Sequence, residues 1–181
     1  MKRCSWCNLN NPIYVEYHDT EWCKVSHDEN YLFEMLILEM FQAGLSWETI
    51  LNKRENFRKS FDNFDYQKIS LYTEQKINEL MNNKGIIRNR RKIESSINNA
   101  KVFMNIQKEY GSFDKYIWSF TNENTIVSNG KEVSNELSDM ISEDLSKKGM
   151  KFVGTKIIYS YLQAIGVIYD HEEDCFLHKE V

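Results

Sequence analysis

Apolar residues recur along this chain with the three-to-four-residue spacing of helices, and the alternation typical of strands is scarce. The stretch NYLFEMLILEMFQA, residues 30–43, is apolar on nearly every side. It therefore predicts a helix buried in the core, with Gly44 directly after its end. Ser46 is placed to cap a second helix over residues 47–61, whose apolar side chains lie on or near one stripe.

The rest of the pattern is also mostly helical. Residues 121–135 are the exception, because they are polar and irregular and predict a loop. Three further helices are predicted to follow caps: residues 74–81 after Thr73, a helix after Ser138 that ends with Gly149 at C′, and residues 156–169 after Thr155. Two more are predicted from their apolar spacing, one through Ile93, Ile97 and Ala100 and one over residues 112–120. The whole pattern predicts an all-α fold in one domain over residues 1–181.

Composition agrees with a single soluble domain. The chain has 181 residues, of which 41% are hydrophobic, and this is enough for a proper core. The densest apolar stretch, YLFEMLILEMF, has eleven residues and two glutamates, which is too short and too charged to cross a bilayer. The N-terminus does not have the pattern of a signal peptide. We expect a cytoplasmic protein with no membrane partner.

The charge distribution is more informative than the net charge of −4. Residues 84–92, KGIIRNRRK, carry five basic side chains and no acidic one, and residues 147–156, KKGMKFVGTK, carry four and none. Each stretch taken singly is typical of an ordinary solvated face. Together on an acidic body they favour a surface that binds phosphates.

Cysteine and histidine gather at the two ends of the chain. The candidates are Cys4, Cys7, His18, Cys23 and His27 at one end, and His171, Cys175 and His178 at the other. Several sets of four could hold a structural metal, and the spacing of Cys4 and Cys7 is that of a zinc knuckle. Buried cysteines without metal are the plain alternative, and a redox pair at Cys4 and Cys7 is a weaker one.

The predicted buried helix contains two isolated acids, Glu34 and Glu39. Apolar neighbours surround both of them on the helix, so a helical wheel does not choose between them. A carboxylate in such a place is paired, or faces a cavity, and is a candidate functional group. Of the two, Glu34 is the one expected to reach solvent. Aromatic residues near such an acid suit a flat, cationic or heterocyclic ligand, although they suit a protein core equally well.

Eight stretches in order along the chain carry a family resemblance: RCSW, YHDTEW, LFEMLILEMFQAGLSWETIL, KRENFR, GIIRNRRKI, WSF, KKGMKFVGTKIIYSYLQAIG and DHEEDC. With them the chain, from residue 3 to 175, resembles the bacterial 3-methyladenine DNA glycosylase I family. The resemblance implies a helix-hairpin-helix glycosylase fold. It also implies a structural zinc site of Cys4, His18, His171 and Cys175, which would join the terminal segments 1–27 and 170–181. Cys7 and Cys23 would stand outside it, and Cys23 replaces the glycine usual in the family.

The same resemblance implies roles for other residues. Glu39 matches the acid of the base pocket, and Tyr14, Tyr17 and Trp47 match its aromatic lining, with Trp6 close by. QAGLS, residues 42–46, matches a loop that probes the DNA stack, with Leu45 as the wedge. A hairpin between helices would bind phosphates. The residues that the resemblance places on DNA are Gly44, Leu45, Lys84, Gly85, Arg88 and Arg90.

The implied function is base-excision repair by a monofunctional DNA glycosylase. A base inside duplex DNA is out of reach, so the enzyme would flip 3-methyladenine out and hydrolyse its bond to the sugar. The products would be free 3-methyladenine and an abasic site in double-stranded DNA. We expect a monomer, and no lyase step, since no lysine of the expected pocket segments suggests a Schiff-base nucleophile. The alternative is a non-catalytic, zinc-stabilised module that binds nucleic acid.

Overall fold

The computed structural model describes residues 1–179, so the last two residues of the predicted terminal segment 170–181 lie outside it. Helices make up most of the described chain, as predicted. They are α1 (Pro12–Glu16), the π-helix η1 (Tyr17–Glu21), α2 (Glu29–Gln42), α3 (Trp47–Leu51), α4 (Arg54–Ser60), the 3-10 helix η2 (Asp62–Phe64), α5 (Tyr66–Ile69), α6 (Glu74–Asn82), α7 (Arg90–Tyr110), α8 (Phe113–Ser119), α9 (Glu136–Lys147) and α10 (Thr155–Ala164).

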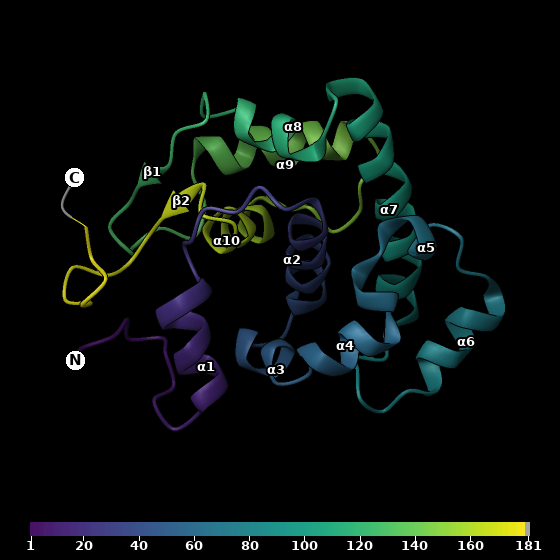
Figure 1. Ribbon diagram of the computed structural model, residues 1–181, viewed down its shortest axis with the longest axis horizontal. Helices are drawn as coiled ribbons and strands as arrows, with labels where there is room; N and C mark the ends of the chain where they lie inside the picture. Colours follow the sequence, from purple (N-terminus) through teal and green to yellow (C-terminus); the bar gives the residue numbers. More distant parts are fainter. Residues whose placement is uncertain (180–181) are drawn as a thin grey trace.

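Helix α2 is the centre of the molecule (Figure 1). Every residue from Leu32 to Phe41 is buried, which confirms the interpretation of its all-round apolar pattern. Helices α3, α7, α8 and α10 contact it. Asp28 caps its first turn, and Gly44 follows its end with φ +82°, a left-handed conformation that glycine adopts without strain. α2 therefore presents different side chains to several neighbouring helices at once.

Several predicted helix boundaries needed correction. The helix expected over residues 47–61 is two helices, α3 and α4, separated at Asn52 and Lys53, although Ser46 does cap the first of them. Thr73 occupies the N-cap position of α6, but its side chain makes no capping hydrogen bond. Helix α9 begins earlier than expected, because Asn135 is its cap and the predicted cap, Ser138, completes the capping box from position N3.

The C-terminal helix is shorter than its apolar pattern predicted. Thr155 is its first residue rather than its cap, and α10 ends at Ala164, before Gly166 at φ +80°. A Cβ at Gly166 would lie 2.4 Å from the backbone nitrogen of Val25. The close approach of these two backbone segments therefore requires glycine. The apolar residues beyond it form β2 (Ile168–Tyr169).

The predicted loop 121–135 contains the short strand β1 (Ile126–Val127), which pairs in parallel with β2. The rest of this stretch is irregular, as predicted. Sequence patterning missed these strands because each has only two residues and their pairing spans about forty positions of the chain. The pair holds the loop against the segment that leads to His171.

The two terminal segments lie on the same side of the molecule (Figure 1), and the backbone nitrogen of Phe176 donates to the carbonyl of Lys2.

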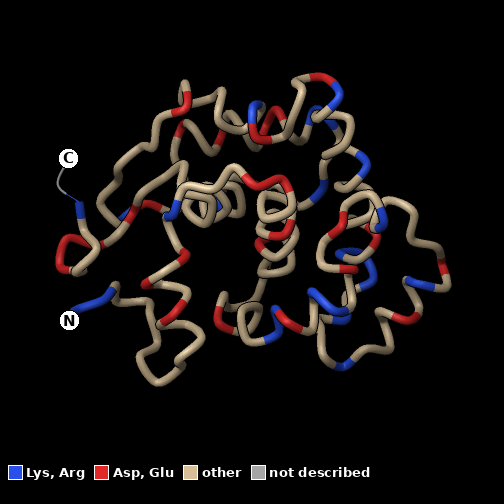
Figure 2. Tube along the Cα trace, in the orientation of Figure 1, with Lys and Arg blue, Asp and Glu red and all other residues tan. Residues whose placement is uncertain are grey.

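Basic residues gather in the half of the molecule built from α4, α6 and the start of α7 (Figure 2). No helix among residues 1–179 is long and apolar enough to cross a membrane.

Candidate functional site

Four side chains from the two ends of the chain form a buried cluster: Cys4, His18, His171 and Cys175. Their sulfur and nitrogen atoms all lie within 4.8 Å of one another. The sulfurs of Cys4 and Cys175 each lie 3.5 Å from Nδ1 of His171, and the sulfur of Cys175 lies 3.5 Å from Nε2 of His18. Two thiols and two imidazoles in this arrangement can bind a metal ion.

Charged partners orient the cluster from outside. Oδ1 of Asp19 lies 2.8 Å from Nδ1 of His18, so that nitrogen carries a proton and Nε2 faces the sulfurs. Arg3 donates two hydrogen bonds to Asp19 and lowers the pKa of that carboxyl group. On the other side, Glu172 accepts hydrogen bonds from the backbone and hydroxyl of Ser5. These bonds also tie the first residues of the chain to the last.

The other two cysteines lie outside the cluster. The thiol of Cys7 contacts the carbonyl oxygen of Tyr14 at 3.8 Å. Cys23 is buried at φ +61°, in the left-handed region that favours glycine. Its sulfur accepts a hydrogen bond from the backbone of Asp170. The cysteine therefore occupies a turn suited to the glycine that it replaces, and its sulfur packs beside the cluster without entering it.

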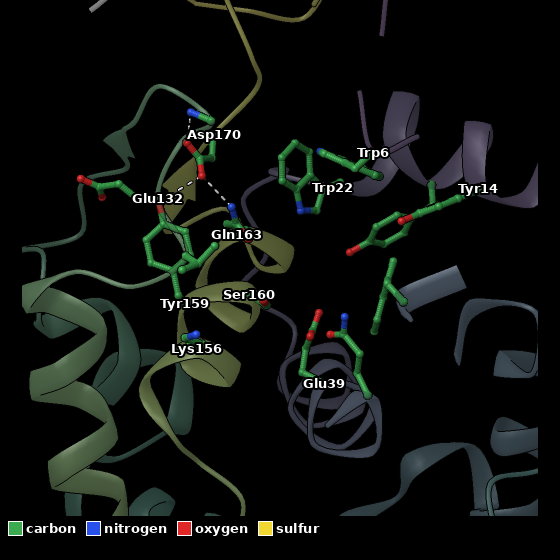
Figure 3. A pocket seen from close by; sticks show the side chains of 15 residues that line it. Trp6, Tyr14, Trp22, Glu39, Glu132, Lys156, Tyr159, Ser160, Gln163 and Asp170 are labelled. Carbon is green, nitrogen blue, oxygen red and sulfur yellow. Dashed lines mark hydrogen bonds between the residues drawn. The ribbon is translucent and has the colours of Figure 1, made fainter. Parts of the chain in front are cut away.

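A cavity of about 410 Å³ opens between the N-terminal segment, α2 and α10 (Figure 3). Five of the residues predicted for the base pocket line it, namely Trp6, Tyr14, Tyr17, Glu39 and Trp47. The rings approach one another closely, with centroids 5.3 Å apart for Trp6 and Tyr14 and 5.4 Å apart for Tyr17 and Trp47. The cavity is thus a concave aromatic site of the kind that binds small flat molecules.

Glu39 points into this cavity from α2 (Figure 3). Its side chain is only 3% exposed, and Oε2 has no hydrogen-bond partner among residues 1–179. Burial raises the pKa of Glu39 to about 8. A buried carboxyl group without a partner is costly for the fold, and it is available to a ligand that can donate hydrogen bonds or carry positive charge.

The prediction that Glu34 reaches solvent was wrong. Its carboxylate is buried and accepts hydrogen bonds from Arg54 at 2.7 Å and from Arg58 at 2.8 Å. Arg54 also donates to Glu21 at 2.8 Å. The helical wheel gave no sign of this network, because both arginines lie on α4 and become neighbours of Glu34 only in the fold.

Sequence reasoning missed the opposite wall of the cavity. That wall consists of Gly130, Glu132, Val133, Lys156, Tyr159, Ser160, Gln163 and Asp170, while Trp22 and Gln42 complete the lining. Asp170 organises it by accepting hydrogen bonds from Gln163, Tyr159 and the backbone of Gly130 (Figure 3). Polar residues at 156, 160 and 163 of an otherwise apolar helix were the available signal, because these positions share one face. Exposed Lys156 also lies on this wall, in a helix outside the segments from which the pocket was predicted.

The residues predicted to meet DNA occupy two places outside the cavity. Gly44 and Leu45 form the turn between Gln42 and Trp47, two residues of its lining, and Leu45 is 41% exposed. The turn between α6 and α7 carries the others. Lys84 and Arg88 are exposed and make no ion pair within residues 1–179, whereas Gly85 is half-buried and Arg90 pairs with Glu74 and Glu94.

Known proteins share this fold. A family model described as methyladenine glycosylase matches residues 6–178. DNA-3-methyladenine glycosylase 1 of Escherichia coli K12 is 41% identical over 180 residues, which cover 97% of this chain and 96% of that protein. A crystal structure of 3-methyladenine DNA glycosylase I superposes with a TM-score of 0.94, at 40% identity over 98% of this chain and all of the other.

A variant of 3-methyladenine DNA glycosylase I in complex with 3-methyladenine has a TM-score of 0.93, at 32% identity over 99% of each chain. The helical fold, the aromatic cavity and the terminal cluster define a compact helical protein with a concave aromatic site. Its chain belongs to the methyladenine glycosylase family. The family resemblance that its motifs predicted is confirmed.

Proposed function

We infer that this protein removes 3-methyladenine from alkylated DNA by hydrolysing the bond between base and sugar, as the first step of base-excision repair. The observation that carries this inference is the unpartnered carboxyl group of Glu39 in an aromatic cavity. Family membership over the whole chain supports the same activity. The products are free 3-methyladenine and an abasic site.

Recognition follows from the chemistry of the damaged base. Methylation at N3 gives the adenine ring a positive charge, so aromatic faces attract it more strongly than they attract a neutral base. Before a base enters, burial favours the protonated form of Glu39, because it raises the pKa of this carboxyl group to about 8. A cationic ring nearby favours the carboxylate form, which then accepts hydrogen bonds from the base edge. The pocket thereby distinguishes charged damaged bases from neutral normal ones.

The chemical step needs less help than most glycosidic cleavages, because a positively charged base is already a good leaving group. Flipping the nucleotide into the cavity costs a few kcal/mol, and less for a damaged base than for a paired one. The transition state has oxocarbenium character at the sugar, and negative charge nearby stabilises it. Water then completes the hydrolysis.

We propose that the step is purely hydrolytic, although Lys156 lies on the cavity wall. A lysine that attacked the sugar would form a Schiff base, which borohydride reduces to a stable cross-link between protein and DNA. Incubation with methylated DNA and borohydride is expected to yield no such cross-link. Its appearance in the native protein and loss in Lys156→Met would instead show lyase activity.

Zinc is the metal that we propose for the terminal cluster, and its role is structural. Tetrahedral zinc with bonds of about 2.3 Å to sulfur and 2.0 Å to nitrogen separates a sulfur and a nitrogen ligand by roughly 3.6 Å. Three of the four such distances in the cluster are 3.5 Å. Held by Cys4, His18, His171 and Cys175, the ion would have no open position for water or substrate, and it would stabilise the junction of the two chain ends. Metal analysis of Cys175→Ser is expected to show lost zinc and a lower Tm.

For DNA binding, we propose that Leu45 fills the gap left by the flipped base, on a turn that Gly44 makes possible. The backbone at Gly85 and the side chains of Lys84 and Arg88 would hold phosphates. Arg90 is expected to contribute less to phosphate binding, because Glu74 and Glu94 already neutralise its charge. We further propose that one copy of the chain suffices, since the lining of the cavity comes from a single chain.

The direct test is chromatography of bases released from methylated duplex DNA by the purified, metal-loaded protein. The proposal predicts free 3-methyladenine in solution, with 7-methylguanine left in the DNA. A folded protein that binds this DNA and releases no base would instead be the non-catalytic nucleic-acid-binding module.

A further inference from the structure

Lys92 is a buried lysine without an acidic partner. It lies in the first turn of α7 and is 5% exposed, although sequence patterning placed it in a basic surface stretch. Its ammonium group makes no ion pair within residues 1–179. Burial lowers the pKa of Lys92, and a buried ammonium group is costly unless several acceptors surround it.

The acceptors that it does have are the last carbonyl groups of α2. Nζ donates to the carbonyl oxygen of Phe41 at 2.8 Å and to that of Ala43 at 2.6 Å. Carbonyl groups at the end of a helix lack partners within the helix and carry its negative dipole, so a cation binds well there. Lys92 thus caps α2 from a residue about fifty positions away.

The capped carbonyls directly precede the turn that carries Leu45. Ala43 is the last residue before Gly44, whose surroundings are open, since an added Cβ would meet no atom within 4 Å. Within the turn itself, the backbone nitrogen of Leu45 donates to Gln42. Apart from these backbone hydrogen bonds, no side chain packs against the Cβ side of Gly44 among residues 1–179. The hydrogen bond from Lys92 to the carbonyl oxygen of Ala43 fixes the position of the residue at which the turn begins.

We propose that Lys92 is a positioning residue, which holds the turn 43–46 so that Leu45 enters duplex DNA when the damaged base leaves the stack. This role rests on the proposed function of the pocket and deepens it. Lys92 is not in the lining of the cavity, so it serves the opening of the duplex and not the binding of the base.

The test compares Lys92→Met with Lys101→Met, the same change at an exposed position of the same helix. Single-turnover excision from methylated duplex DNA is expected to slow by about 10-fold to 100-fold in Lys92→Met, because small displacements of a positioning group have effects of this size. Affinity for free 3-methyladenine and excision from methylated single strands are expected to change by less than about threefold. Lys101→Met is expected to match the native protein.

A double-mutant cycle with Leu45→Ala separates positioning from general damage to the fold. If Lys92 acts through Leu45, the double variant is no slower than the slower single one. Multiplied effects, or an equal loss of free-base affinity, would overturn the inference. Should Lys92→Met not fold, Lys92→Gln keeps an amide NH2 group with two N–H donors and is expected to show an intermediate loss confined to duplex DNA. Native protein that released no base at all would overturn the proposed function, and this inference with it.

Discussion

Helix α2 carries two buried glutamates five residues apart, and their surroundings are opposite. Glu34 meets two arginines and is fully paired, whereas Glu39 meets aromatic rings and empty space. The first contributes to the fold by joining α2 to α4. Glu39 lowers the stability of the fold, and its carboxyl group is available to bind a ligand. Burial alone therefore does not identify a functional carboxyl group, while burial without a partner does.

The largest expected effect on stability comes from breaking the paired site. Glu34→Gln leaves Arg54 and Arg58 without their shared buried charge, and it is expected to lower the free energy of unfolding by about 3 kcal/mol. Urea unfolding measures this change. Glu55→Gln, which removes an exposed partner of Arg58, is the matched control and should cost less than about 1 kcal/mol. Equal effects in the two variants would mean that the buried network is not the support we describe.

The unpaired site should respond in the opposite way. Glu39→Gln removes the carboxyl group that can hydrogen-bond the base edge, so affinity for free 3-methyladenine, which is neutral once it has left the sugar, is expected to fall by about 30-fold, or about 2 kcal/mol. Thermal stability should not fall, because no hydrogen bond of Glu39 within residues 1–179 is lost. Calorimetric titration with the free base measures the first effect and thermal unfolding the second. Unchanged affinity together with a lower Tm would assign Glu39 to the core.

The dependence of stability on pH sharpens the same contrast. The pKa of Glu39 is about 8 in the folded protein and about 4.3 in an unfolded chain. Between these values folding must take up a proton, so the contribution of Glu39 to stability falls as pH rises from 5 to 8. Glu39→Gln has no such proton, and its stability relative to the native protein should rise over this range. Parallel pH profiles in chemical denaturation would contradict the raised pKa.

The smallest effects come from a pair of tryptophans. The indole nitrogen of Trp47 is buried at the cavity and has no hydrogen-bond partner in the described part of the chain, whereas that of Trp118 donates to the carbonyl of Ser26 at 3.2 Å. Trp118→Phe should therefore lower stability by about 1 kcal/mol more than Trp47→Phe. Unfolding curves of the two variants test this difference, and the reverse order would mean that Trp47 has a partner in solution.

The sequence was sufficient to predict those features that neighbouring residues determine. The apolar pattern identified α2 and its end at Gly44, because a buried helix and a left-handed turn are both set by neighbouring residues. The family motifs identified the four residues of the terminal cluster, whose own spacing left several sets open. They also chose Glu39 over Glu34, which the helical wheel did not.

What remained hidden depends on contacts between distant segments. Nothing in the sequence pattern distinguishes Arg54 or Lys92 from ordinary surface charges, and only the fold brings them to Glu34 and to the end of α2. The wall organised by Asp170 was missed for the same reason, since it combines α10 with the loop before α9. Long-range pairing of polar groups leaves little periodic trace in a sequence.

The most direct test of the central claim is single-turnover release of 3-methyladenine from methylated duplex DNA by three proteins: the native chain, Glu39→Gln and Glu34→Gln. The reaction is run well below the melting temperature of the least stable one. We predict rapid release by the native protein, near-native release by Glu34→Gln, and release at least about 100-fold slower by Glu39→Gln. Native rates in Glu39→Gln would contradict the account, because the unpartnered carboxyl group would then have no part in excision.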